Sequence, residues 1–216
     1  MRVYDCRLPA ERDQGIAAAV SAVRRGELIV MPTDTLYGLG CDAFKKNAVA
    51  SMLRAKGRGR ETAVPVMVGS RKTLDGLAHR MPKAARDLAD AFWPGALSII
   101  IRHAKTLDWG LGETDGTVAV RMPLQPVALE VLREIGPMAV LTASKAGSAP
   151  AATAADAKAQ LGYAARIYLD GGTAADAVPS TIVDLTGEAP RVVRAGAVSV
   201  EQVRDVVPDL VADDPA

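Results

Sequence analysis

Short apolar runs alternate with longer amphipathic segments along this chain, and the alternation limits the folds that it can adopt. The run Leu28 to Met31 lies between Gly26 and Pro32 and is apolar throughout, which predicts a buried strand. The segment before it, 8–25, has apolar residues at helical spacing and ends in two arginines, which predicts a helix. Since strands and helices keep alternating and no long linker divides them, we expect one mixed α/β domain.

The same patterns predict elements over the rest of the chain. The expected helices cover 47–55, 82–93, 126–135 and 154–161, and the capping pair Ser199 and Gln202 opens a last helix. The expected strands cover 64–68, 97–102, 117–121, 138–142, 167–169, 181–184 and 191–194. Residues 105–116 form a turn-rich connection that is a candidate lid. We expect a single domain over 1–204 and an acidic tail over 205–216, frayed from 211 onward.

Composition excludes several functional classes. Lys and Arg number 26 and Asp and Glu 25, so the formal net charge is +1 and an extended nucleic-acid-binding surface is not expected. Aromatic residues make up 4% of the chain, too few for base-stacking platforms. The longest apolar stretch, 96–101, is far too short to span a membrane, and the charged N-terminus is unlike a signal peptide.

The positions of the cysteines and histidines exclude further kinds of site. Cys6 and Cys41 have no CxxC spacing, and His79 and His103 are isolated in the sequence. We therefore expect neither a metal site nor histidine-based catalysis. This cysteine usage suits a reducing compartment, so we expect a cytoplasmic protein with no membrane partner.

The most informative segment is 28–40, LIVMPTDTLYGLG, in which a buried strand runs into hydroxyl, carboxylate and glycine residues. In extended backbone Thr33 and Thr35 face one side and Asp34 faces the other. Two hydroxyls are then available to a small polar ligand, which the following glycines let the backbone approach. A strand-to-turn connection, in which these side chains bond local backbone groups, carries equal weight on spacing alone.

Cations and hydroxyls also gather elsewhere along the chain. Residues 54–60, RAKGRGR, place four cations and two glycines on a turn, which suits polyphosphate but is also typical of a solvated basic turn. Hydroxyls or arginines occur near the ends of four more expected strands, at Ser98, Arg121, Ser180 and Arg194, and the hydroxyl-rich segment 141–150 is a candidate anion cradle. So many ligand-type residues at strand ends suggest one shared crevice.

Taken in order, these segments resemble the YrdC-like family, the threonylcarbamoyl-AMP synthases. The motifs are PTDTLYGLG (32–40), AKGRGR (55–60), WPGALS (93–98), VAVRMP (118–123), PSTIVD (179–184) and RAG (194–196), and the match covers roughly residues 10–204. The resemblance implies an α/β, YrdC-like three-layer fold, in which an open, twisted mixed sheet is flanked by helices around one large basic cavity. It also indicates the short form of the family, without the additional C-terminal domain.

The reaction that the resemblance implies is a nucleotidyl transfer. L-threonine, bicarbonate or CO2, and ATP with Mg²⁺ give L-threonylcarbamoyladenylate and pyrophosphate, with no protein-bound metal or organic cofactor. The product supplies the threonylcarbamoyladenosine modification of tRNAs that read codons beginning with A. The implied partner is a downstream tRNA threonylcarbamoyl transferase, so we expect tRNA binding by this chain to be weak or absent.

The resemblance also assigns residues, none of which is a nucleophile. The threonine site would contain Thr33, Tyr37, Arg121 and Ser180. The nucleotide site would contain Lys56, Arg58, Ser98, Thr142, Ser144 and Arg194, with Lys56 and Arg58 stabilising charge. Arg60 lies just outside the matching pattern.

Two departures from the family pattern keep alternatives open. The family usually shows Ser/Thr-Ser-Ala-Asn-x-Ser-Gly where this chain has LTASKAG (141–147), so Ser144 replaces Asn and Ala146 replaces Ser. A serine hydroxyl offers one donor where an asparagine amide offers two, and it reaches less far. In addition, many relatives have a histidine where this chain has Gly69. The alternatives are a catalytically altered paralogue that binds RNA, and another small-molecule enzyme on the same fold.

Overall fold

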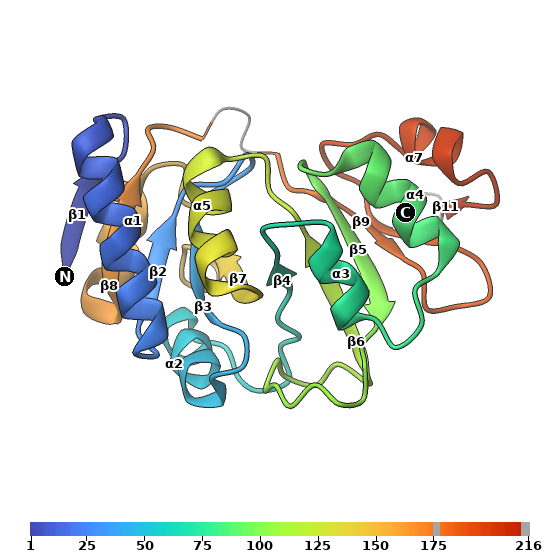
Figure 1. Ribbon diagram of the computed structural model, residues 1–216, viewed down its shortest axis with the longest axis horizontal. Coiled ribbons are helices and arrows are strands. Elements are labelled where there is room, and N and C mark those ends of the chain that lie inside the picture. Colours follow the sequence, from blue (N-terminus) through green and yellow to red (C-terminus); the bar gives the residue numbers. More distant parts are fainter. Residues whose placement is uncertain (175–177, 213–216) are drawn as a thin grey trace.

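The computed structural model describes residues 1–174 and 178–212. Within these residues eleven strands form one mixed sheet that is flanked by helices (Figure 1). The helices are α1 (Pro9–Arg24), α2 (Lys46–Lys56), α3 (Lys72–Leu77), α4 (Lys83–Phe92), α5 (Pro126–Ile135), α6 (Ala154–Leu161) and α7 (Val200–Val206), and a short 3-10 helix at Gly162–Ala164 follows α6. The strands are β1 (Arg2–Asp5), β2 (Leu28–Met31), β3 (Gly38–Asp42), β4 (Val66–Met67), β5 (Leu97–Arg102), β6 (Thr117–Arg121), β7 (Met138–Thr142), β8 (Ala165–Asp170), β9 (Thr181–Asp184), β10 (Arg191–Arg194) and β11 (Val211–Ala212). Their order across the sheet is β1-β8-β2-β3-β7-β4-β6-β5-β9-β10-β11.

Strand β2 shows why its sequence is apolar throughout rather than alternating. Its residues Leu28 and Val30 belong to the core that also contains buried residues of α2 and α6. The intervening Ile29 and Met31 belong to a second core, with buried residues of α1 and α5. Because both faces of the strand are covered by helices, every position along it favours an apolar side chain.

The sheet is narrowest at its centre. Strand β4 has two residues, and it joins five strands on the β7 side to five on the β6 side. Val66 lies opposite Ala139 of β7 in an antiparallel pairing and opposite Val120 of β6 in a parallel pairing. In Figure 1 the strands β1, β8, β2 and β3 accordingly lie on one side of β4, and β6, β5 and β9 lie on the other.

Most of the expected elements are confirmed. The bounds agree fully for α5, α6, β5, β6, β7, β9 and β10, and within one residue at each end for α1, α2 and α4. Ser199 and Gln202 form the expected capping box at the start of α7. The strand expected over 64–68 is confined to β4, and the strand expected over 167–169 extends to the full length of β8.

Three elements escape the sequence patterns, and each has a local reason. Strand β3 contains two glycines in five residues and has low strand propensity, but a side chain at Gly38 would meet the Val140 Cγ1 atom at 2.7 Å. Close packing against β7 therefore selects glycine there. Helix α3 is short and contains Gly76, and β1 is a four-residue edge strand with a half-exposed sequence.

The end of the chain and the candidate lid also differ from expectation. The expected frayed tail is wrong at Val211 and Ala212, which form β11 beside β10; residues 213–216 lie outside the described part of the chain. The 105–116 connection is anchored, since the Val64 amide donates to the Leu111 carbonyl at 2.8 Å. Among the described helices none is both long and apolar enough to cross a membrane.

Candidate functional site

A pocket of about 550 Å³ lies at the narrow centre of the sheet. It is lined by β4 together with residues of β6 and β7, and by loops from both sides of the sheet. Its polar lining residues are Thr33, Thr35, Ser98, Thr114, Thr117, Arg121, Thr142, Ser180 and Arg194. Seven of the ten residues expected to bind substrate line it, namely Thr33, Tyr37, Ser98, Arg121, Thr142, Ser180 and Arg194.

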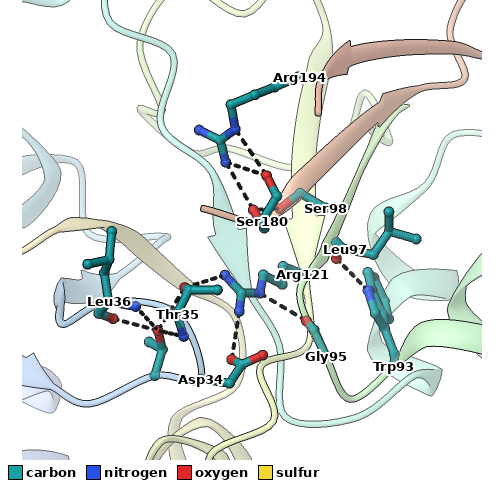
Figure 2. A network of polar contacts seen from close by, with 11 residues as sticks. Asp34, Thr35, Leu36, Trp93, Gly95, Leu97, Ser98, Arg121, Ser180 and Arg194 are labelled. Atoms are coloured by element: carbon teal, nitrogen blue, oxygen red, sulfur yellow. Dashed lines mark hydrogen bonds and ion pairs between the residues drawn. The ribbon is translucent and has the colours of Figure 1, made fainter. Parts of the chain in front are cut away.

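Arg121, the last residue of β6, is held from three directions at this pocket (Figure 2). Its Nε donates to the Gly95 carbonyl at 3.0 Å, its Nη1 to the Thr35 hydroxyl at 3.0 Å and its Nη2 to the Asp34 carboxylate at 2.6 Å. The side chain is 6% exposed. Burial lowers the pKa of Arg121 from its ordinary value, and the charge of Asp34 opposes that change.

Arg194, the last residue of β10, has a simpler environment. Its Nε and Nη2 both donate to the Ser180 carbonyl, at 3.0 and 2.8 Å, and Nη2 also lies 3.1 Å from the Ser180 hydroxyl. That hydroxyl is 2.9 Å from the hydroxyl of Ser98 on β5 (Figure 2). Burial and the nearby positive charge of Arg121 lower the pKa of Arg194. The pocket therefore contains two guanidinium groups close enough to repel one another.

The turn after β2 uses its own hydroxyls locally. The Thr33 hydroxyl donates to the Leu36 carbonyl, and it accepts from the backbone amides of Thr35 and Leu36 at 3.2 and 3.1 Å. The side chains of Thr33 and Thr35 lie on one side, as expected, with their hydroxyl oxygens 3.1 Å apart. Thr33 thus shapes the turn with its hydroxyl, as in the strand-to-turn alternative, while it also lines the pocket.

Tyr37 also has partners inside the protein. Its hydroxyl donates to the Gly172 carbonyl at 2.5 Å and accepts from the Gly171 amide at 3.0 Å. Burial raises the pKa of this phenol. The ring therefore lines the pocket as an anchored wall, fixed to the segment that follows β8.

The three remaining expected residues do not line the pocket. Lys56 ends α2, and its ammonium group donates to the carbonyls of Thr142 and Ser144, both at 2.5 Å. The Ala146 amide in turn donates to the Lys56 carbonyl at 2.9 Å, so the 142–146 loop is tied to the end of α2. Burial, followed by the charge of Arg58, lowers the pKa of Lys56 to about 8. Arg58 itself is exposed.

Two glycines explain local features of the site. A side chain at Gly196, in the RAG segment, would meet the Pro179 carbonyl oxygen at 2.3 Å, so close contact with the Ser180 segment requires glycine. A side chain at Gly69 would lie 2.7 Å from the Arg133 amide nitrogen of α5. Gly69, where many relatives have histidine, thus lies at a point where the backbone packs closely on α5.

Sequence reasoning missed the partners of Arg121. The alternation of an extended backbone predicts Asp34 on the opposite side from the two threonines, and nothing in the sequence indicates that it reaches a residue 87 positions away. Gly95 contributes only its carbonyl, which no pattern of side chains reveals. The rule that a charged residue at the end of a buried strand needs a partner was the available signal, although it does not name the partner. Among the described residues, no group of three or more His, Cys, Asp or Glu side chains is arranged to hold a metal ion.

Known proteins resemble this chain over most of its length. The model of the Sua5/YciO/YrdC family, described as telomere recombination, matches residues 21–196. A Mycobacterium tuberculosis protein that is provisionally named a threonylcarbamoyl-AMP synthase is 52% identical over 204 residues, 94% of each chain. The threonylcarbamoyl-AMP synthase of Pyrococcus abyssi is 33% identical over 197 residues, which are 90% of this chain and 58% of that one.

Solved structures of Sua5 and YciO proteins also resemble this chain. Pyrococcus abyssi Sua5 in complex with L-threonine superposes with a TM-score of 0.87 at 31% identity, over 92% of this chain and 58% of that one. Escherichia coli YciO superposes with a TM-score of 0.79 at 28% identity, over 93% and 96% of the two chains. The open mixed sheet flanked by helices is thus the fold of these structures. The chain belongs to the Sua5/YciO/YrdC family.

Proposed function

We propose that this chain is a threonylcarbamoyl-AMP synthase, which forms L-threonylcarbamoyladenylate and pyrophosphate from L-threonine, bicarbonate or CO2, and ATP. The observation that carries the proposal is the 52% identity, over 94% of both chains, to a relative with that name. The pocket supports it, because two arginines and several hydroxyls converge there on a ligand-sized space.

The chemistry of this reaction suits the residue types at the pocket. The threonine amine adds to CO2 and loses a proton to give a carbamate. A carbamate oxygen then attacks the α-phosphorus of ATP, and the bond to pyrophosphate breaks. Both reactants are anions, so the protein must neutralise charge and align them, and it needs no nucleophile of its own.

The two arginines would divide this work. Arg121 is already paired with the Asp34 carboxylate. It would therefore orient a ligand through directed hydrogen bonds more than it would add net positive charge. Arg194 contacts only the neutral carbonyl and hydroxyl of Ser180, and no contact to its Nη1 occurs within 1–174 and 178–212. We therefore assign Arg194 to the phosphates, together with Ser98 and Thr142. Arg121, Tyr37 and Ser180 are assigned to threonine, beside the turn that Thr33 shapes.

Lys56, Arg58 and Ser144 complete the nucleotide site in this proposal, although they do not line the pocket. An ammonium group has three N–H donors, and the carbonyls of Thr142 and Ser144 take two of them. No residue that the structure describes accepts from the third, which is available to a phosphate oxygen. Arg58 follows on the exposed turn, where it is free to move toward a bound triphosphate. Mg²⁺ would enter on the ATP phosphates, whose oxygens are its preferred ligands.

Pyrophosphate release from the purified chain tests the proposal. We expect release only when L-threonine, bicarbonate, ATP and Mg²⁺ are all present, with formation of threonylcarbamoyl-AMP detected by mass spectrometry. Release without threonine would indicate another small-molecule enzyme. Absence of release by a chain that binds tRNA, with affinity falling steeply as salt rises, would favour the RNA-binding alternative. Transfer to tRNA, tested by adding a tRNA threonylcarbamoyl transferase, should require that second protein.

A further inference from the structure

Asp34 lies next to the pocket without lining it. It belongs to the connection between β2 and β3, and its side chain is 14% exposed. Its neighbours Thr33 and Thr35 line the pocket, whereas the Asp34 carboxylate approaches the Arg121 guanidinium from outside the lining. The reaction proposed above gives this buried charge no role.

The contact between Asp34 and Arg121 crosses the narrow centre of the sheet. Arg121 ends β6, on one side of β4, while Asp34 and Thr35 belong to the turn that joins strands on the other side. Among the strands that the structure describes, only β4, with its two residues, pairs with both sides of the sheet. The guanidinium therefore forms a polar bridge that fixes the β2–β3 turn against the end of β6, as Figure 2 shows.

This bridge also sets the direction of the Thr35 hydroxyl group. The Thr35 hydroxyl accepts from Arg121 Nη1, and the Thr33 hydroxyl gives its own hydrogen to the Leu36 carbonyl. The Thr33 oxygen already accepts from the backbone amides of Thr35 and Leu36, which uses both of its lone pairs, so the hydrogen of the Thr35 hydroxyl, 3.1 Å away, is not required there. Arg121 thus occupies one lone pair of the Thr35 hydroxyl and orients this group, and the Asp34 carboxylate holds Arg121 in place.

We propose that Asp34 is a positioning residue, which holds Arg121 across β4 and through it orients Thr35 at the threonine side of the pocket. This inference rests on the proposed function. Three of the five guanidinium N–H groups are used within the protein, on Gly95, Thr35 and Asp34. Within 1–174 and 178–212, one N–H on Nη1 and one on Nη2 have no acceptor, and their direction is fixed before any ligand arrives.

The substitution Asp34→Asn tests the proposal because it removes the charge and keeps the size of the side chain. Loss of a charged hydrogen-bond partner predicts a KM for threonine that rises on the order of tenfold to a hundredfold. The KM for ATP should change little, because Arg194 and Lys56 do not contact Asp34. Calorimetric titration with L-threonine alone should show the same weakening. Asp75→Asn is the matched control, since Asp75 pairs with Arg86 on the exposed surface.

A second variant, Thr35→Val, keeps the test decisive if Asp34→Asn lowers stability. It removes the acceptor of Arg121 Nη1, so it should also weaken threonine binding and spare ATP binding. The double variant should lose less than the product of the two single losses, because both act through Arg121. Independent effects, an unchanged threonine KM, or equal losses for threonine and ATP would each overturn the proposal. If the unmodified chain releases no pyrophosphate, the proposed function fails instead, and threonine calorimetry still decides the role of Asp34.

Discussion

The two sides of the pocket are built differently. On the proposed threonine side, Arg121 is buried and bonded to three groups from two loops, and its charge is balanced by Asp34. On the proposed nucleotide side, Arg194 bonds only Ser180 within the described part of the chain, and Arg58 is exposed. The side chains of the threonine side are thus held in position before any ligand binds. The nucleotide side instead keeps positive charge available for a triphosphate.

Removing Arg121 should have the largest effect, because it damages both the site and the fold. Arg121→Ala leaves the partly buried Asp34 carboxylate without its partner, which costs up to about 3–5 kcal/mol in the free energy of unfolding. Pyrophosphate release should fall by roughly a hundredfold or more. Urea unfolding and initial-rate measurements check the two effects together.

The exposed pair of Arg86 and Asp75 supplies the control for that experiment. Arg86→Ala should change the free energy of unfolding by less than about 1 kcal/mol, because surface ion pairs contribute little. A similar loss of stability in both variants would show that the Arg121 bridge is no different from a surface ion pair.

Removing Arg194 should separate activity from stability. Arg194→Ala loses a charge near the phosphates, so the rate of pyrophosphate release should fall on the order of a hundredfold. The melting temperature should change little, because the Ser180 groups left behind are neutral. Arg204→Ala, on the exposed face of α7, is the control. Full activity of Arg194→Ala would remove this residue from the nucleotide side.

A methyl group at Gly196 should displace Arg194 without removing it. Gly196→Ala places Cβ 2.3 Å from the Pro179 carbonyl, so the RAG segment must move; a strain of this kind costs about 1–3 kcal/mol. We expect a lower melting temperature and a raised KM for both ATP and threonine, because the added Cβ would also lie 2.6 Å from the Ser180 carbonyl carbon. In the matched variant Gly187→Ala the nearest atom lies at 3.7 Å, and these quantities should stay unchanged. A Gly196→Ala chain that behaves like Gly187→Ala would contradict this packing argument.

The smallest expected effect is a pH dependence on the nucleotide side. Lys56 has a pKa lowered to about 8 by burial, so its ammonium group loses its proton as pH rises through that value. The kcat/KM for ATP, which reports the free enzyme, should fall above pH 8. Lys56→Arg should remove that decline, since arginine stays charged. A decline that persists in Lys56→Arg belongs to another group.

The same pKa shift has a consequence for stability. The folded chain binds the Lys56 proton less tightly than the unfolded chain, whose lysine has a pKa near 10.5. Between about pH 8 and 10.5 this residue therefore adds to the free energy of unfolding as pH rises. A lysine that is stabilised by a carboxylate would instead lower the free energy of unfolding as pH rises.

The sequence predicted the order of most elements and seven residues that line the pocket, but not how their side chains are held. Apolar runs and caps locate β5, β6, α5 and β7 because these elements obey local patterns. Strand β3 lacks the apolar pattern of a strand, and it forms because its glycines allow close packing against β7. The resemblance predicts Lys56 at phosphate, but it does not predict the two loop carbonyls, 86 and 88 residues away, that accept from its ammonium group. Such long-range contacts leave no spacing signal in one sequence.

Calorimetric titration of L-threonine into the unmodified chain tests the difference between the two sides most directly. Because the threonine side is already bonded in place, we predict saturable threonine binding without nucleotide. The affinity should change by less than about threefold when an unreactive ATP analogue is added, because little structural coupling is needed. Threonine binding that occurs only in the presence of the analogue would contradict a preformed threonine side.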